Sequence, residues 1–197
     1  MTSSPPEKRK RRKPRRITPT YLERAGLAYL ERYAASSAHF RTVMLRKVAR
    51  SAREQGTSVE EGAEMVDALI ARFRKAGLLD DAAYASARAR SLFRAGRPRP
   101  FIVQALRAKG LGADDIDLAL QALTDELDYS DIAAAATYVK RRRIGPYRHD
   151  KARAENRQRD LAALGRSGFS FGVARAAVDA ADPDALADLV NDADRRD

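Results

Sequence analysis

No group of side chains in this 197-residue sequence combines the types and the spacing that catalysis needs. It has no cysteine, which excludes a thiolate nucleophile, a disulfide and a cysteine-ligated metal. The two histidines, His39 and His149, lie far apart in the sequence, and neither has the spacing to carboxylates that is typical of an acid–base or metal site. Asp80 and Asp81 are better explained as acidic residues that cap the start of a helix. No glycine-rich phosphate loop with a following lysine is present. We therefore expect no enzymatic activity, no cofactor and no metal.

The chemistry that the sequence does offer is the binding of anions. Lysine and arginine number 38 against 27 aspartate and glutamate, which leaves a net charge of +11. A chain this basic is typical of proteins with an anionic partner, most often nucleic acid. The charge is uneven, since residues 1–16 carry +7 and residues 182–197 carry −4. The basic arm at the start could contact phosphate or could serve only to keep the chain soluble.

Two basic clusters lie within the central part of the chain. The first surrounds a predicted junction between two helices. The second begins with four consecutive basic residues and continues through Arg148, Lys151, Arg153, Arg157 and Arg159. Tyr138 and Tyr147 are interleaved with the second cluster and could stack on nucleobases. A solvated helix face would explain some of these charges equally well. The candidate residues for contacts with a protein partner or DNA are Arg88, Arg90, Arg94, Arg97, Arg99, Arg107, Lys109, Lys140, Arg141, Arg142, Arg143, Arg148 and Lys151.

The elements that must position these residues are helices. The sequence has no sustained alternation of period two and no hairpin turn signal. Apolar residues recur at helical spacing instead, and glycines punctuate them. The predicted helix starts are Thr18–Pro19, Ser37, Ser58 with Glu61, and Asp80. The predicted helix ends include Gly56, Gly77, Gly96 and Gly110. The pattern predicts nine helices between residues 18 and 181.

These helices repeat in groups of three. The helix end Gly110-Leu111 recurs as Gly168-Phe169 at an offset of 58 residues. Gly96 lines up with Gly145 at an offset of 49 residues, nine short of that spacing. Units this small bury little surface alone, so we expect three tandem repeats to pack in a row. The predicted fold is all-α, with three helix-turn-helix-like repeats forming an elongated, curved body.

The predicted organisation has five parts. They are a disordered basic arm over residues 1–17, three-helix repeats over 18–79, 80–128 and 129–181, and an acidic tail over 182–197. Only Leu186, Leu189 and Val190 could anchor a short helix in that tail. No apolar run approaches the roughly 18 residues that a membrane span needs, and no secretory signal follows the basic start. We expect a monomer in the cytoplasm.

The middle of the chain resembles one bacterial family of regulators. The residues that carry the resemblance are Gly77-Leu78-Leu79-Asp80-Asp81, Tyr84-Ala85, Arg88, Gly96, Pro98 or Pro100, Ile102, Leu106 and Lys109-Gly110-Leu111. Further matches are Ala28-Tyr29-Leu30 and Leu45-Arg46-Lys47 before this block, and Arg141 to Arg148 and Asp160 to Phe171 after it. With these residues the sequence is similar to the RecX family over about residues 20–180. The basic arm is not part of the resemblance.

The resemblance implies tandem three-helix repeats without catalytic activity or a cofactor. It also implies binding to the RecA recombinase and to the RecA filament on single-stranded DNA. A member of the family would inhibit the ATPase, recombinase and coprotease activities of RecA in DNA repair and the SOS response, and could also bind DNA directly. Two other interpretations of the residues remain: an autonomous helical DNA-binding protein, and a helical adaptor for another acidic protein.

Overall fold

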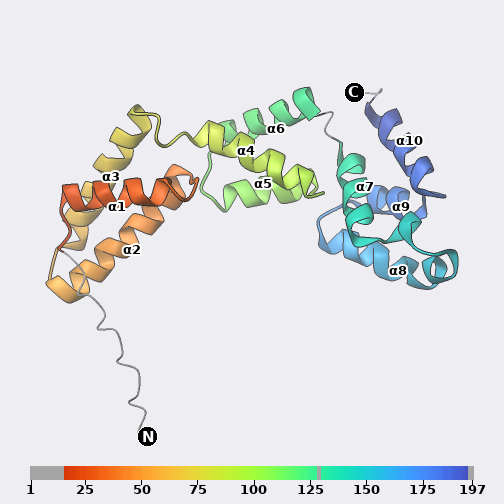
Figure 1. Ribbon diagram of the computed structural model, residues 1–197, viewed down its shortest axis with the longest axis horizontal. Coiled ribbons are helices and arrows are strands. Elements are labelled where there is room, and N and C mark those ends of the chain that lie inside the picture. The colour runs from red at the N-terminus through yellow and green to blue at the C-terminus, as the bar shows by residue number, and fades with distance from the viewer. Residues whose placement is uncertain (1–15, 128–129, 195–197) are drawn as a thin grey trace, which may run out of the picture. The chain divides into compact units, whose positions relative to one another are not determined.

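The computed structural model describes residues 16–127 and 130–194. Every regular element in these ranges is helical, with ten α-helices and one short 3₁₀ helix (Figure 1). The predicted all-α fold is confirmed: nine α-helices lie between residues 18 and 181, as predicted, and the tenth lies in the acidic tail. By their internal contacts the residues form two compact units, divided between Leu79 and Asp80.

The first unit is a three-helix repeat in which a side chain caps the start of each helix. Its helices are α1 (Pro19–Leu30), α2 (Ser37–Gln55) and α3 (Val59–Lys75). As predicted, Thr18 caps α1 and Ser58 caps α3, each by accepting the backbone amide three residues on. The cap of α2 is Ser36 and not Ser37, because Ser36 keeps an extended backbone and its hydroxyl accepts the His39 amide at 3.2 Å.

The apolar core of the first unit reaches back to residue 17. Ile17 is 7% exposed, and its amide donates to the Ser51 hydroxyl at 3.2 Å. The prediction of a disordered arm up to residue 17 is therefore wrong at Ile17. This residue directly precedes the cap of α1, a position from which an apolar side chain packs onto the first helical turns. Residues 1–15 of the predicted arm lie outside the described residues. The largest fully buried side chains of this core include Leu22, Phe40, Met44, Val48 and Val66.

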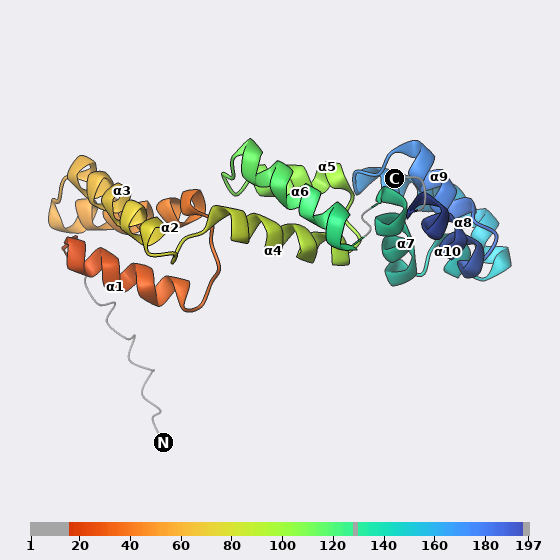
Figure 2. The same cartoon turned by 90° about the horizontal axis from the view of Figure 1, so that it is seen from above.

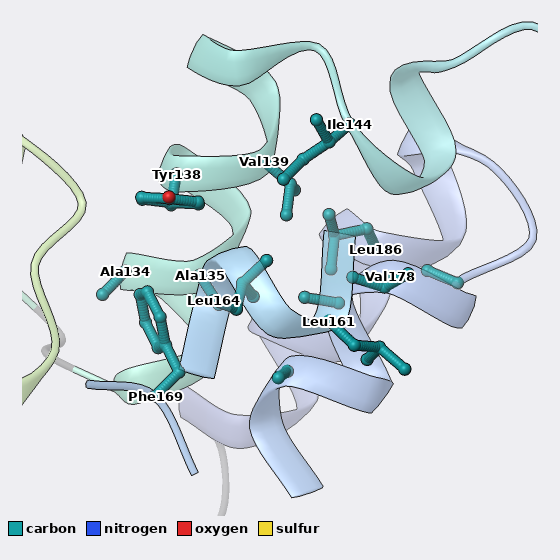
Figure 3. Close-up of a cluster of buried hydrophobic side chains, with 13 residues drawn as sticks. Ala134, Ala135, Tyr138, Val139, Ile144, Leu161, Leu164, Phe169, Val178 and Leu186 are labelled. Carbon is teal, nitrogen blue, oxygen red and sulfur yellow. The ribbon is translucent and has the colours of Figure 1, made fainter. Parts of the chain in front are cut away.

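The second unit contains two hydrophobic clusters. The first lies among α4 (Asp81–Arg94), α5 (Arg99–Arg107) and α6 (Ala113–Leu127). The second lies among α7 (Asp131–Arg142), the 3₁₀ helix η1 (Gly145–Tyr147), α8 (Asp150–Arg166), α9 (Phe171–Asp179) and α10 (Pro183–Asp194), and is drawn in Figure 3. Phe93 of α4 packs against both clusters. The two clusters correspond to two further helical repeats, joined into one unit.

Helix ends with a left-handed residue confirm one predicted correspondence between repeats and correct another. Gly110 and Gly168 both have positive φ, at 73° and 95°, and both follow the last turn of a second helix. After α7, however, the left-handed residue that ends the helix is Arg143, with φ of 52°, while Gly145, also left-handed with φ of 58°, begins η1. The counterpart of Gly96 is therefore Arg143. The prediction that matched Gly96 with Gly145 was wrong because Arg143 ends α7, and Gly145 lies two residues further on, against the backbone of Val178.

The acidic segment after residue 181 includes the helix α10. The Asp182 carboxylate accepts the amides of Asp184 and Ala185 at 2.9 and 2.8 Å, which caps this helix. Leu186 is 1% exposed and belongs to the same hydrophobic cluster as α7 and α9. α10 lies beside α7 (Figures 1 and 2). A single buried leucine can hold α10 in place because it completes a core that other helices already form.

The junction between α4 and α7 is unusually close. A Cβ atom added at Gly96 would lie 2.8 Å from the Tyr138 nitrogen and 3.0 Å from the Ala134 oxygen. Arg141 donates to the Ala95 carbonyl at 3.1 Å, and the Arg99 amide donates to the Asp131 carboxylate at 3.0 Å. The backbone of one repeat thus packs directly on the backbone of the next.

We expect Gly96→Ala to destabilise the second unit by clearly more than Gly168→Ala. Both glycines are left-handed, and placing alanine there costs about 1–2 kcal/mol. Gly168 has only ordinary contacts around its position, with the nearest atom 3.5 Å away, whereas Gly96 abuts the backbone of α7. Urea unfolding measures the difference. Equal shifts of the two midpoints would show that the close approach at Gly96 is unimportant.

Candidate anion-binding site

Some residues of the first basic cluster form contacts inside the repeat. Arg90 forms two hydrogen bonds to Glu126, at 2.9 and 2.8 Å, which tie α4 to α6. The Arg97 guanidinium lies 4.5 Å from the centre of the Phe101 ring. Asp80 caps α4 by accepting the Ala83 amide at 2.8 Å, as predicted. The remaining candidates are exposed at Arg88, Arg94, Arg99 and Arg107 and half-buried at Lys109.

In the second cluster the structure separates internal arginines from outward ones. Arg141 donates to the Ala95 carbonyl at the junction of the repeats. Arg157 forms two hydrogen bonds to Asp179, at 2.7 and 2.6 Å. Arg153 donates to the carbonyl oxygens of Val178, Ala180 and Ala181, where α9 ends. These three arginines hold neighbouring helices together, so the basic run is not a uniform contact surface. Lys140, Arg143 and Lys151 are exposed.

Four arginines of the third repeat surround one cavity of about 330 Å³. Arg159 and Arg166 come from one face of α8, because their spacing of seven residues is close to two helical turns. Arg142 comes from the last turn of α7. The fourth is Arg148, which follows η1. The cavity is lined by Tyr138, Arg142, Ile144, Arg148, Arg159, Asp160, Ala163 and Arg166.

A buried carboxylate fixes one side of this arginine pocket. Asp160 is 2% exposed, and its oxygens accept Arg148 Nε at 2.7 Å, Arg148 Nη2 at 2.8 Å and the Gly145 amide at 3.0 Å. Burial opposes ionisation of Asp160, but the hydrogen bonds from Arg148 and Gly145 outweigh it, so the pKa of Asp160 is lowered. The same pair raises the pKa of Arg148. Asp160 is therefore ionised and holds the Arg148 fork in a fixed orientation.

The wall of the arginine pocket is part of the hydrophobic core. The Tyr138 ring is 7% exposed and packs edge-on against Phe169 with centroids 5.7 Å apart (Figure 3). The Arg142 guanidinium lies 5.5 Å from the centre of the Tyr138 ring. The interpretation that Tyr138 stacks on nucleobases is wrong, because the ring is buried. Its position gives Arg142 an aromatic support instead.

This arrangement suits an oxyanion. Within the described ranges, no ion pair joins a carboxylate to Arg142, Arg159 or Arg166. Four guanidinium groups face one carboxylate, which leaves an excess of positive charge beside an apolar wall. Guanidinium groups bind phosphate and carboxylate oxygens in pairs, and a fixed fork loses little entropy on binding.

Sequence reasoning placed Arg142, Arg148 and Arg159 in a basic cluster that could bind anions, but it missed Asp160 and Arg166. The spacing of Arg159, Ala163 and Arg166 on one helical face was a signal that could have found Arg166. Nothing local marks Asp160 as the partner of Arg148. In the described ranges, no group of three or more metal-ligating side chains occurs, and no helix is long and apolar enough to cross a membrane.

Comparison with known proteins gives consistent matches. A family model described as "RecX, second three-helix domain" matches residues 80–120, which include α4 and α5. The regulatory protein RecX of Myxococcus xanthus is 43% identical over 178 residues, covering 88% of this chain and 94% of that protein. The regulatory protein RecX of Agrobacterium fabrum is 32% identical over 115 residues, covering 58% of this chain and 59% of that protein. A crystal structure of a regulatory protein RecX is similar with a TM-score of 0.50 and 25% identity, covering 79% of this chain and 68% of that one.

We expect Asp160→Asn to destabilise the protein by about 2 kcal/mol at neutral pH, because it weakens charged hydrogen bonds in a buried place. The lowered pKa of Asp160 stabilises the fold above its unfolded value of about 3.9, and this contribution is lost as the pH falls through the folded pKa. The stability difference between wild type and variant should therefore shrink in acid. Urea unfolding at several pH values measures it.

Asp179→Asn is the matched control for this prediction. Asp179 also pairs with an arginine through two hydrogen bonds, but both side chains are over a third exposed. A surface pair of this kind contributes at most about 1 kcal/mol. An equal loss in the two variants would contradict a special role for the buried pair.

Proposed function

The chain belongs to the RecX family of regulatory proteins, and we propose on this basis that it binds RecA and the filament that RecA forms on single-stranded DNA. In this proposal it inhibits the ATPase, recombinase and coprotease activities of RecA, and so acts in DNA repair and the SOS response. It works by binding alone, as a cytoplasmic monomer without a cofactor.

One observation carries this proposal: the 43% identity to a regulatory protein RecX over nearly the full length of both chains. A match of this extent includes all three predicted repeats and not only the block at residues 80–120. The resemblance of the sequence to the family supplies RecA as the partner.

The arginine pocket supports the proposal by its chemistry. A nucleoprotein filament presents two kinds of oxyanion, the carboxylates of the protein and the phosphates of the DNA. Arg142, Arg159 and Arg166 line the pocket and form no salt bridge among the described side chains, so they can pair with either kind. Repeats that each contact the filament would add their affinities through a high effective concentration.

The same pocket also supports a second candidate, direct binding of DNA without RecA. A guanidinium group can form paired hydrogen bonds to a phosphodiester as well as to a carboxylate. Such binding would fall steeply with salt and would be equal for competitor DNA of any sequence.

The proposal predicts that the protein inhibits ATP hydrolysis by RecA on single-stranded DNA at less than one molecule per RecA monomer. Bound molecules that act on a filament affect several subunits at once, which explains the low stoichiometry. The measurement is a titration of RecA ATPase activity at two salt concentrations. No inhibition at stoichiometric protein would refute the proposal, and a salt-dependent DNA shift in its place would favour the second candidate.

For the arginine pocket we expect the double variant Arg159→Glu, Arg166→Glu to inhibit RecA at least tenfold more weakly, since tenfold corresponds to about 1.4 kcal/mol. Both side chains are exposed, so the helix content in circular dichroism should not change. The control Arg24→Glu, Arg74→Glu makes the same change of net charge at exposed positions of the first unit. If both double variants lose inhibition equally, the effect is one of total charge and the pocket is not the contact.

A further inference from the structure

The first unit carries a second pocket whose chemistry differs from that of the arginine pocket. It lies where α1 ends against α2 and has a volume of about 250 Å³. Two tyrosines, two cations and three small apolar side chains form it. The lining residues are Ala25, Ala28, Tyr29, Arg32, Tyr33, Val43 and Lys47.

The aromatic side of this tyrosine pocket has one anchored ring and one projecting ring. Tyr29 is half-buried, packs against the first core and has its centroid 6.1 Å from that of Phe40. Tyr33 is 57% exposed, and its ring centroid lies 5.2 Å from that of Tyr29 at an interplanar angle of 39°. The anchored ring supports the projecting one, so Tyr33 offers an accessible aromatic face at a defined place.

The rest of the tyrosine pocket is apolar and shallow. Ala25 and Ala28 stand three residues apart on α1, and Val43 comes from α2. Methyl groups at these positions leave room beside the rings. The space therefore suits a flat group that can lie against an aromatic face.

Two cations complete the pocket. Lys47 lies one helical turn after Val43 on α2, and Arg32 follows the end of α1. No carboxylate lines the pocket, and neither cation has an ion pair among the side chains that the structure describes. Three other arginines of this unit do have a carboxylate partner, as Arg41 has Asp67 at 2.6 Å. The unmatched positive charge therefore calls for an anionic ligand.

We propose that this tyrosine pocket binds a nucleotide of single-stranded nucleic acid, with the base stacked on Tyr33 and the phosphate beside Arg32 and Lys47. A nucleotide combines a flat ring and an anion in one unit, which is what the pocket offers to bind. A peptide would need an aromatic and an acidic residue side by side to do the same. The site goes beyond the proposed regulation of RecA and does not depend on it.

The test is fluorescence anisotropy of the full-length protein with a labelled oligothymidylate, without RecA. Tyr33→Ala should weaken binding about tenfold, the scale of one lost base–aromatic stack, whereas Tyr33→Phe should bind like wild type. An abasic oligonucleotide of the same length should bind wild type more weakly and should not respond to Tyr33→Ala. Lys47→Gln should lower the dependence of affinity on salt by about one phosphate contact, or roughly 0.7 in the logarithmic slope.

The control variant is Phe171→Ala, which removes an aromatic ring that is 69% exposed on α9. It should leave binding of oligothymidylate unchanged. The proposal is overturned if Tyr33→Ala binds oligothymidylate like wild type, or loses affinity equally for the abasic strand. It is also overturned if an acidic peptide containing phenylalanine depends on Tyr33 while the oligonucleotide does not. Because RecA is absent throughout, none of these outcomes bears on the inhibition of RecA.

Discussion

The structure depends on how its short helices stop. At Gly77, Gly96, Gly110 and Gly168, and at Arg143, the backbone turns left-handed, and the next amide bonds back to a carbonyl five residues earlier. In three of these turns the residue that donates this bond is also buried, as with Leu111, Ile144 and Phe169. Each such stop ends a helix and returns an apolar side chain to the core it came from. Small three-helix units become possible because the chain reverses within two or three residues.

In small units much of the polar surface lies close to another helix. Many arginines therefore form hydrogen bonds within the protein. A guanidinium has five donors, so it can tie a helix to a carbonyl or a carboxylate of a different helix. Arg90, Arg141, Arg153 and Arg157 are used in this way. The arginines that are not used in this way, and not the net charge of the chain, determine what a partner can bind.

The two proposed sites differ in the chemical groups that they would bind on a nucleoprotein. The arginine pocket is polar, is braced by the buried Asp160 and fits oxyanions. The tyrosine pocket is mainly apolar, has a projecting ring and fits a flat group with one charge beside it. They lie in different compact units, so each can be tested by variants that leave the other unit untouched.

The sequence by itself determined the helical class, most helix starts and stops, the repeat and the family. Helix starts and stops depend on neighbours within about five residues, as the caps at Thr18 and Asp80 and the stop at Gly110 illustrate. Its errors came where tertiary packing overrides a local signal: Ile17 is buried against helices that follow it in the sequence, and Gly145 packs on the backbone of Val178 instead of ending α7.

Only the tertiary structure decided which charged side chains are available. The partner of Arg148 is twelve residues away, and that of Arg141 is 46 residues away. Spacing along a helix shows which face a residue occupies, but not what the fold places opposite that face. For the same reason Asp160 and Tyr33 could not be recognised as site residues, because each belongs to a pocket only when two elements meet.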